Sequence, residues 1–297
     1  MTHRTYIISV EGNIGSGKTT LIHYLDGLWG SSGLGGKRCM FLREPVPLWE
    51  SVKDVNNGEN ILQKFYKDQS KYAFPFQVLA YMSFYKQLID EIKNAREDTI
   101  IICERSMQSS RAIFAKMLKE SGDIDDISYQ ILEMFYQQID DIPLDAVIYL
   151  DTEDSLCDER ITKRARLGEN NIPMEYLEKC HQYHQHWLRD IASNQSDNKI
   201  NILRLNGLSS KSEMVVNIKN FIEDVYPKVI GYCSGCNVET IIYSNDRYHI
   251  LCKGETRRLL CNSCFNDCWR DAYKDGWMME DDIVYTGEDF DTDDWTN

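Results

Sequence analysis

Long apolar runs are missing from this sequence of 297 residues. No stretch of about 18 consecutive apolar residues occurs, which excludes an ordinary transmembrane helix and argues against a membrane partner. The first apolar run begins at residue 5, which leaves no room for a signal or transit peptide. We therefore expect a soluble intracellular protein, most simply a cytoplasmic one.

Basic residues are also scarce, above all near the C-terminus. Residues 275–297 contain nine acidic residues and no Lys or Arg, whereas the rest of the chain carries 38 acidic and 33 basic residues. The net charge of −14 therefore lies mostly in an acidic tail, residues 279–297, whose composition predicts disorder. This charge argues against non-specific nucleic-acid binding. A regulatory or partner-binding role of the tail stays open.

Cysteines are few over most of the chain and concentrated in one part of it. Of the ten cysteines, six lie between Cys233 and Cys268. Without a secretory signal, such clustering favours a metal over disulfides. Two Cys-x-x-Cys pairs suit a tetrahedral structural zinc site, which leaves no open position for catalysis, and free structural cysteines are the alternative. The predicted zinc ligands are Cys233, Cys236, Cys261 and Cys264.

The apolar runs predict how the chain is organised. Residues 1–228 alternate short β-like runs with helical patterns, which indicates an α/β fold with a parallel sheet covered by helices on both faces. Residues 229–278 would form a small zinc-binding module resembling a zinc ribbon or treble clef, because a segment of this size needs a metal to fold. Strands are predicted at 5–10, 38–43, 99–103, 145–151 and 200–205. Helices are predicted at 18–29, 74–95, 106–119, 126–139, 154–166, 173–192 and 210–225.

Residues 12–19 read Gly-Asn-Ile-Gly-Ser-Gly-Lys-Thr, between a strand-like run and a helical one. This pattern predicts a phosphate-binding loop, in which backbone N–H groups and the positive end of the following helix face an anion. Lys18 can reach the outer phosphates, and the Thr19 hydroxyl can bind Mg²⁺. The alternative, a chance glycine-rich turn, fits the flanking elements poorly. The residues predicted here to bind ATP and Mg²⁺ are Gly12, Asn13, Ile14, Gly15, Ser16, Gly17, Lys18 and Thr19.

Charged residues follow two other predicted strands directly. Glu44 follows the strand at 38–43, and Glu104 and Arg105 follow the strand at 99–103. Ligands of open parallel sheets bind at the carboxyl ends of strands, so a carboxylate here can take a hydroxyl proton and an Arg can offset developing charge. The alternative is a structural Glu–Arg pair that caps the strands.

A basic helix end leads into a Gly-Glu-Asn-Asn turn at 168–171. The basic residues of this helix end are Arg160, Lys163, Arg164 and Arg166. A basic helix end that runs into a mobile loop suits a lid over phosphates, while an ordinary solvated basic face is the alternative.

Taken together, these stretches resemble the deoxynucleoside kinases, the family of deoxycytidine kinase, deoxyguanosine kinase, mitochondrial thymidine kinase and the insect multisubstrate enzyme. The resemblance covers residues 1–226. Besides the loop and the lid, the matching motifs are Arg-Glu-Pro-Val at 43–46, Phe-Tyr-Lys-Asp at 65–68, Phe-Pro-Phe-Gln at 74–77, Glu-Arg-Ser at 104–106 and Ile-Pro-Met-Glu-Tyr-Leu at 172–177. It implies a P-loop kinase with a five-stranded parallel sheet, a nucleotide salvage reaction and a homodimer.

The resemblance also implies a role for each residue at the phosphate end of the site. The loop and Lys18 would hold ATP, and Thr19 and Glu104 would lie close to Mg²⁺. Glu44 would be the general base on the 5′-hydroxyl of the deoxynucleoside, with Arg105 holding that site and stabilising the transferring charge. The three lid arginines, Arg160, Arg164 and Arg166, would close over the phosphoryl group.

At the nucleoside end, the resemblance implies binding by polar and aromatic side chains. Tyr66 and Glu169 would bind the 3′-hydroxyl and disfavour ribonucleosides, and the Gln77 amide would pair with the base edge. Phe114 would stack on the base while Trp49 and Phe76 wall the pocket, although ordinary core packing is the alternative for such aromatic residues.

Two positions carry base specificity in this family. Its deoxycytidine- and purine-type members have an Asp–Arg pair where this chain has Ser110 and Phe84. The missing pair resembles the thymidine-accepting branch, in which a slot stays open for the 5-methyl group. The resemblance thus implies a preference for thymidine or deoxycytidine over purines, without ranking the two. Leu79 stands where a Tyr is common, which removes one polar wall of the pocket.

Two other functions fit part of the pattern. A nucleoside monophosphate kinase shares the fold, but it would need further Arg residues to hold the acceptor phosphate. A non-catalytic nucleotide-binding adaptor would use the zinc module to recruit a partner, but the intact Lys18, Glu44 and Glu104–Arg105 argue against it. The role of the zinc module stays open among dimer support, partner docking and nucleic-acid contact.

Overall fold

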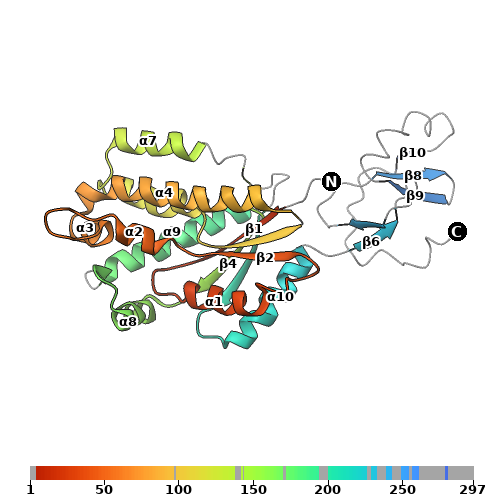
Figure 1. Ribbon diagram of the computed structural model, residues 1–297, viewed down its shortest axis with the longest axis horizontal. Helices are drawn as coiled ribbons and strands as arrows, with labels where there is room; N and C mark the ends of the chain where they lie inside the picture. The colour runs from red at the N-terminus through yellow and green to blue at the C-terminus, as the bar shows by residue number, and fades with distance from the viewer. Residues whose placement is uncertain are drawn as a thin grey trace. The chain divides into compact units, whose positions relative to one another are not determined.

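The computed structural model describes most of the first 225 residues and short strands beyond them (Figure 1). By packing, the chain divides into two compact units, Met1–Ile218 and Lys219–Asn297. The described ranges are 5–96, 98–137, 142, 144–169, 172–193 and 200–225, followed by 229–232, 239–242, 249–253, 256–260 and 278–279.

A parallel sheet forms the centre of the first unit, as predicted. Its five described strands are hydrogen-bonded in the order β2-β3-β1-β4-β5, and each pair is parallel. The strands β1, β3 and β4 are buried almost throughout, which matches their near-continuous apolar sequences. The strands are β1 (Thr5–Gly12), β2 (Arg38–Leu42), β3 (Thr99–Glu104), β4 (Ala146–Asp151) and β5 (Asn201–Asn206).

Helices cover both faces of this sheet. Figure 1 shows α4 and α7 on one side and α1 on the other. The helices and helical turns are α1 (Lys18–Trp29), α2 (Val46–Ser51), α3 (Ile61–Lys67), α4 (Gln69–Asn94), α5 (Met107–Ser109), η1 (Ser110–Ala115), α6 (Lys116–Glu120), α7 (Asp126–Tyr136), α8 (Asp154–Arg164), α9 (Met174–Ser193) and α10 (Lys211–Val225).

Three features of the helices differ from the prediction. The short helices α2 and α3 were not predicted, because six or seven residues are too few to show a helical period. The single helix expected at 106–119 is interrupted by the π-helical turn η1. The helix α4 starts at Gln69 instead of residue 74, because the Asp68 side chain accepts a hydrogen bond from the Lys71 N–H.

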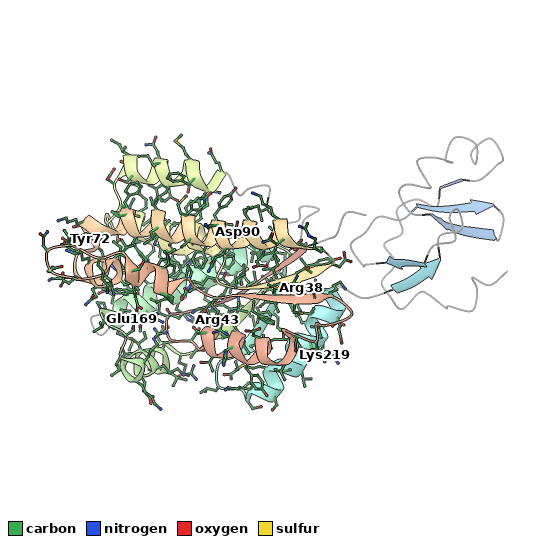
Figure 2. All side chains as sticks on the ribbon, in the orientation of Figure 1. Arg38, Arg43, Tyr72, Asp90, Glu169 and Lys219 are labelled. Carbon is green, nitrogen blue, oxygen red and sulfur yellow. The ribbon has the colours of Figure 1, made fainter. Side chains whose placement is uncertain are left out.

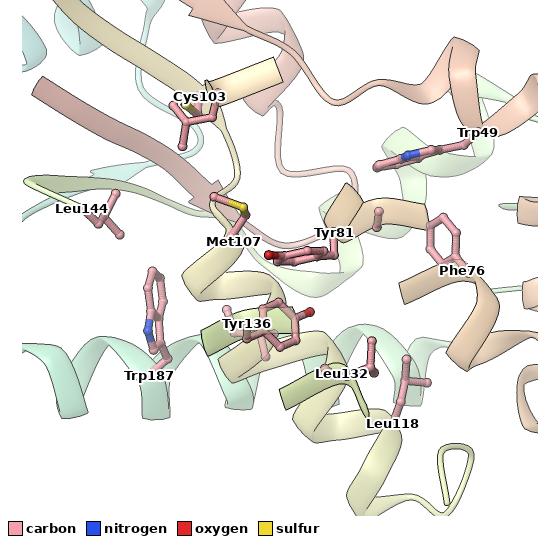
Figure 3. Close-up of a cluster of buried hydrophobic side chains, with 14 of the residues drawn as sticks. Trp49, Phe76, Tyr81, Cys103, Met107, Leu118, Leu132, Tyr136, Leu144 and Trp187 are labelled. Carbon is pink, nitrogen blue, oxygen red and sulfur yellow. The ribbon is translucent and has the colours of Figure 1, made fainter. Parts of the chain in front are cut away.

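The main hydrophobic core lies between the sheet and the helices on the α4 side. It includes Trp49, Phe76, Tyr81, Tyr136 and Trp187, all of which are buried (Figure 3). These aromatic side chains come from α2, α4, α7 and α9, so the core packs these four helices against the sheet that carries the predicted functional residues.

Beyond the end of α10 at Val225, the second unit is described only through its strands. An antiparallel pair joins β6 (Val229–Tyr232) to β7 (Glu239–Ile242), and β8 (His249–Lys253) pairs with β9 (Thr256–Leu260) and β10 (Met278–Met279). The predicted zinc ligands Cys233, Cys236, Cys261 and Cys264 lie outside the described residues, as do residues 280–297 of the acidic tail.

Two kinds of feature are absent from the described residues. No helix there has the length and apolar character needed to cross a membrane. No cluster of three or more His, Cys, Asp or Glu side chains suited to a metal ion was found in the same ranges.

Candidate active site

The loop 12–19 turns sharply from β1 into α1. Gly15 has a positive φ of 79°, and a Cβ atom added there would lie 2.4 Å from the carbonyl oxygen of Cys157. Gly12 is similarly constrained, because an added Cβ would lie 2.7 Å from the carbonyl oxygen of Leu150. Only glycine fits these two positions, so α8 and β4 hold the loop in a shape that side chains would disrupt.

Lys18, the first residue of α1, is buried against the loop. Its Nζ atom donates to the carbonyl oxygens of Gly12, at 3.0 Å, and Asn13, at 2.7 Å. Burial, together with the nearby positive charge of Arg105, lowers the pKa of Lys18 to about 8. The ammonium group is therefore charged at neutral pH, as its predicted contact with an outer phosphate requires.

Hydrogen bonds fix the loop to elements far away in the sequence. Asn13 Nδ2 donates to Asp154 Oδ1 at 2.8 Å and to the Leu177 carbonyl oxygen at 2.9 Å. Arg160 Nη1 donates to the carbonyl oxygen of Ser16 at 2.8 Å, and its Nη2 donates to that of Gly207 at 3.3 Å. Arg160, predicted as a lid residue, is thus bound to the loop backbone in this structure.

The three residues predicted past β2 and β3 lie together. Arg105 Nε donates to Glu44 Oε1 at 2.6 Å, and its Nη1 donates to the Gly12 carbonyl oxygen at 3.0 Å. Thr19 donates to Glu104 Oε1 at 2.5 Å, and the Glu44 N–H approaches Glu104 Oε2 at 3.4 Å. The carboxyl ends of three neighbouring strands therefore bring two carboxylates, one guanidinium and one hydroxyl into one cluster.

The electrostatics separate the two carboxyl groups. Burial acts to raise the pKa of Glu44, but the charges of Arg105 and Lys18 outweigh it and hold that pKa below its ordinary value. Burial and the negative charge of Glu44 raise the pKa of Glu104. Glu44 is therefore ionised at neutral pH and has the features of a base. Arg105 also has a positive φ of 67°, a strained conformation of the kind that gathers at functional sites.

The predicted lid is closed onto a carboxylate. Glu169 Oε2 accepts from Arg164 Nη2 at 2.6 Å, and Glu169 Oε1 accepts from Arg166 Nη1 at 2.9 Å. The buried Glu169 lies beside α8 in Figure 2. The adjacent Gly168 approaches α3, since a Cβ added to it would lie 2.8 Å from the Cα of Gln63. Two lid arginines therefore share one acidic partner.

A cavity of about 680 Å³ links these groups to an aromatic end. Trp49 Nε1 donates to Ser83 Oγ at 2.9 Å, and the Trp49 ring makes edge contacts with Phe76 and Phe84. Gln77 Oε1 is buried and has no hydrogen-bond partner among the described residues. This buried acceptor at the wall of the cavity is therefore available to an N–H donor inside it.

Most of the predicted residues share this cavity. Gly12 and Asn13 do not line it, but their carbonyl oxygens accept from Lys18, which does. The predicted residues that line it are Ile14, Gly15, Ser16, Gly17, Lys18, Thr19, Glu44, Trp49, Tyr66, Phe76, Gln77, Phe84, Glu104, Arg105, Ser110, Phe114, Arg160, Arg164, Arg166 and Glu169.

Some lining residues were missed by the sequence analysis. Ser209, Lys211 and Met214 line the cavity from the turn after β5 and the start of α10. The rule that places ligands past the carboxyl ends of strands, applied to the last strand as well, would have found the first two. Tyr176 also lines it, and the sequence analysis placed it in the motif at 172–177 without assigning it a role.

Comparisons with known proteins decide the family. The model of the family described as deoxynucleoside kinase matches residues 8–230. The chain belongs to the deoxynucleoside kinase family. It is 34% identical over 235 residues to the probable deoxycytidine kinase of fowlpox virus (strain NVSL), an overlap of 76% of this chain and 91% of the viral protein.

Two human relatives are named for different substrates. The chain is 32% identical over 185 residues to mitochondrial thymidine kinase 2, which covers 61% of this chain and 64% of the relative. It is 31% identical over 200 residues to human deoxycytidine kinase, with 61% and 74% covered. The deoxynucleoside kinase is therefore a phosphotransferase, as predicted, and its family implies ATP and Mg²⁺. The relatives do not agree on one base.

Proposed function

We propose that this deoxynucleoside kinase transfers the γ-phosphate of ATP to the 5′-hydroxyl of a pyrimidine deoxynucleoside in nucleotide salvage. The observation that carries the proposal is the position of the Glu44–Arg105 pair. It lies in one cavity between the phosphate-binding loop and the aromatic end that contains Gln77. The 5′-hydroxyl of a nucleoside bound at the aromatic end would therefore lie next to both Glu44, as the general base, and the γ-phosphate.

Glu44 would act as the general base. Its lowered pKa keeps it ionised at neutral pH, and the hydrogen bond from Arg105 to Oε1 fixes its orientation. We assign the other carboxylate oxygen to take the proton of the 5′-hydroxyl. The 5′-oxygen then bonds to the γ-phosphorus of ATP, the bond from that phosphorus to the β–γ bridging oxygen breaks, and ADP leaves. Arg105, which keeps its charge throughout, would stabilise the negative charge that develops during the transfer.

The phosphate end offers ligands of the right chemistry. Backbone N–H groups of the loop and Lys18 would hold the phosphates of ATP. The Thr19 hydroxyl and the Glu104 carboxylate are adjacent oxygen donors, which suits Mg²⁺, an ion often bound by one or two protein groups plus substrate phosphates. When bound, Mg²⁺ supplies charge neutralisation at those phosphates. Arg164 and Arg166 would complete the enclosure from the lid.

The aromatic end suits a flat base. Phe114 lines the cavity, with the Arg105 guanidinium 4.7 Å from the centre of its ring. The unpaired Gln77 Oε1 would accept from a base N–H, and Tyr66, whose pKa burial raises, would keep its proton for the sugar 3′-hydroxyl. Phe84 lines this end of the cavity and packs edge-on against Trp49. The preference for a pyrimidine is proposed from Ser110 and Phe84, which stand where purine-type members of the family have an Asp–Arg pair.

A substrate panel tests the proposal. The purified full-length protein is incubated with ATP, Mg²⁺ and each of the four natural deoxynucleosides, and the rates are compared. We expect thymidine or deoxycytidine to be phosphorylated faster than deoxyguanosine and deoxyadenosine. Thymidine monophosphate serves as the control for the monophosphate kinase alternative and should not be phosphorylated. A clear purine preference, or preferred use of the monophosphate, would contradict the proposal.

We further propose that the enzyme is a homodimer. The amphipathic helix α7 exposes apolar side chains, with Ile127 71% and Met134 66% accessible, and Met82 of the adjoining α4 is 50% accessible. Burial of these side chains between two copies would account for their apolar character. Sedimentation equilibrium should give twice the chain mass, and Ile127→Lys combined with Met134→Lys should give the monomer. A monomeric wild-type protein would refute this.

The zinc site at Cys233, Cys236, Cys261 and Cys264 likewise remains a proposal, which rests on the spacing of the two Cys-x-x-Cys pairs. Metal analysis should find one tightly held zinc ion per chain. Absence of zinc from protein purified without chelators would refute the site.

A further inference from the structure

Glu11, the residue before the phosphate-binding loop, carries a buried carboxyl group to which the function proposed above gives no role. It lies in β1 and is 0% exposed. Its Oε1 atom accepts a hydrogen bond from Ser106 Oγ at 2.9 Å, and its Oε2 atom has no hydrogen-bond partner among the described residues. Burial of such a group costs free energy. We therefore expect Glu11 to do something that an apolar side chain could not.

The hydroxyl partner of Glu11 belongs to the turn that presents Arg105. This turn joins β3, which ends at Glu104, to α5, which starts at Met107, and so consists of Arg105 and Ser106 alone. Arg105 has a positive φ of 67°. A non-glycine residue keeps such a strained conformation only where its surroundings hold it. The contacts of these two residues therefore decide where the guanidinium group lies.

Three consecutive residues of β1 hold the turn. The Val10 carbonyl oxygen accepts from the Arg105 N–H at 3.1 Å, and the Gly12 carbonyl oxygen accepts from Arg105 Nη1 at 3.0 Å. Both contacts use backbone oxygens, which any residue at these positions would supply. Between them, Glu11 accepts from Ser106. Of these three contacts, only this middle one depends on a side chain of β1.

The far side of the turn is anchored as well. Ser106 caps α5, since its Oγ atom also accepts from the Ser109 N–H at 3.0 Å. Met107 is buried in the main core (Figure 3). Because both β3 and α5 are held, the strain would be released by rotation within the turn itself. Such a rotation would carry the Arg105 guanidinium away from Glu44 Oε1, to which its Nε atom donates at 2.6 Å.

Glu11 acts from outside the cavity. Arg105 and Glu44 line the cavity, whereas Glu11 is not among its lining residues. Burial raises the pKa of Glu11, and the positive charge of nearby Arg105 acts against this rise. An effect of Glu11 on the reaction would therefore pass through the turn and Arg105.

We propose that Glu11 is a positioning residue for phosphoryl transfer, which accepts from Ser106 to hold Arg105 in its strained conformation and its guanidinium against the general base Glu44. The inference rests on the proposed function and deepens it, because it names what keeps Arg105 and Glu44 together. Glu11 acts through Ser106 and does not itself touch the substrate.

The test compares two substitutions of Glu11 in the full-length protein. Glu11→Gln keeps the shape of the side chain and an oxygen that accepts from Ser106. Its new N–H can pair with the buried hydroxyl of Ser9, which lies on the same face of β1 and has no partner among the described residues. Glu11→Leu has a similar volume but no acceptor. Both variants lose the charge, so the difference between them isolates the hydrogen bond.

Two further variants and a control complete the set. Ser106→Ala removes the donor of the same hydrogen bond, and it is also combined with Glu11→Leu. Gln108→Leu is the matched control, because it removes a different hydrogen bond of α5, the one from Gln108 Nε2 to the Ile142 carbonyl oxygen at 3.2 Å. The single-turnover rate of phosphoryl transfer and the KM for ATP are measured with the pyrimidine deoxynucleoside that the wild type uses fastest. Thermal unfolding checks that each variant is folded.

We expect Glu11→Leu to lower the transfer rate about tenfold, the worth of one hydrogen bond to a carboxyl group. Its KM for ATP should stay within about threefold of the wild-type value, because Lys18 and Thr19 keep their hydrogen bonds. The rate of Glu11→Gln should also stay within about threefold of the wild-type rate, since the acceptor is kept.

Ser106→Ala should be at least as slow as Glu11→Leu, because it also removes the cap of α5. The double variant should be no slower than Ser106→Ala, since the same hydrogen bond cannot be lost twice. Gln108→Leu should stay within about twofold of the wild-type rate, which separates positioning of the turn from the general stability of α5.

A folded Glu11→Leu variant within about twofold of the wild-type rate would overturn the inference. A Glu11→Gln variant as slow as Glu11→Leu would also overturn it, because the effect would then belong to the charge. If Glu11→Leu does not fold, Ser106→Ala decides, and a wild-type rate for that variant would overturn the inference. These results leave the proposed kinase function intact. Failure of the wild type to phosphorylate any deoxynucleoside would instead refute that function and this inference with it.

Discussion

Glu44→Gln is the substitution that most directly separates chemistry from binding in this site. The amide keeps the shape of the side chain and one oxygen that can accept from Arg105 Nε, now 2.6 Å from Glu44 Oε1. It loses the negative charge that would take the proton of the 5′-hydroxyl. Loss of a general base lowers a rate typically by about 10²- to 10⁴-fold, so we expect kcat to fall by that factor.

The same substitution should leave nucleotide binding nearly unchanged. Lys18, Thr19 and the loop backbone do not depend on Glu44 for their hydrogen bonds, so the KM for ATP should stay within about threefold of the wild-type value. Arg105 would lose the charge of a buried partner, at a cost of about 1–3 kcal/mol in the free energy of unfolding. Urea unfolding measures this cost.

Steady-state kinetics with thymidine at saturating ATP provide the assay for Glu44→Gln. Glu50→Gln is a matched control, since it makes the same chemical change on α2, outside the residues that line the cavity. A Glu44→Gln variant that retains more than a tenth of the wild-type kcat would refute the assignment of Glu44 as the base.

Three further predictions follow from the geometry. Gly15→Ala should abolish ATP binding and destabilise the fold by about 1–3 kcal/mol, because φ at Gly15 is positive and the new Cβ would meet a carbonyl oxygen. Calorimetry measures both effects. Gly27→Ala is the control: it lies in α1, nothing lies within 4 Å of its added Cβ, and it should not destabilise the fold. The kcat/KM for ATP should fall as pH rises through about 8, where the buried Lys18 loses its proton, and a flat profile to pH ~10 would exclude this role. Burial holds the pKa of His184 well below 6.5, so at mildly acidic pH the unfolded chain binds a proton there that the folded chain does not. Through this group, the free energy of unfolding should fall by ~1 kcal/mol as the pH falls from 6.5 to about 5.5. His184→Gln should remove that part of the pH dependence.

The sheet and the charged cluster could be predicted because both depend on short-range signals. Each strand is a compact apolar run, and the residues that follow a strand lie by necessity at its carboxyl end. Glu44 and Arg105 therefore come together in the structure although they lie 61 positions apart in the sequence. A parallel sheet imposes that proximity without any further information.

Other parts of the site depend on contacts that no local pattern reveals. The hydrogen bond between the Ser110 and Tyr136 hydroxyl groups joins residues 26 positions apart, and Ser110 belongs to a π-helical turn, which helical periodicity alone reads as a continuous helix. Arg160, predicted to close over the phosphoryl group, lines the cavity and also donates to the carbonyl oxygens of Ser16 and Gly207, because the loop and the turn after β5 both reach it. Such long-range hydrogen bonds are fixed only when the whole fold is assembled.

The central claim is that this cavity transfers phosphate to the 5′-hydroxyl of a deoxynucleoside. The most direct measurement incubates the wild-type protein with ATP, Mg²⁺ and thymidine, and identifies the product by phosphorus NMR, with 5′-deoxythymidine as the control that lacks the acceptor. The account predicts thymidine 5′-monophosphate and ADP in equal amounts, and no transfer to the control. Phosphate found on the 3′-oxygen, or ADP formed without a nucleotide product, would contradict it.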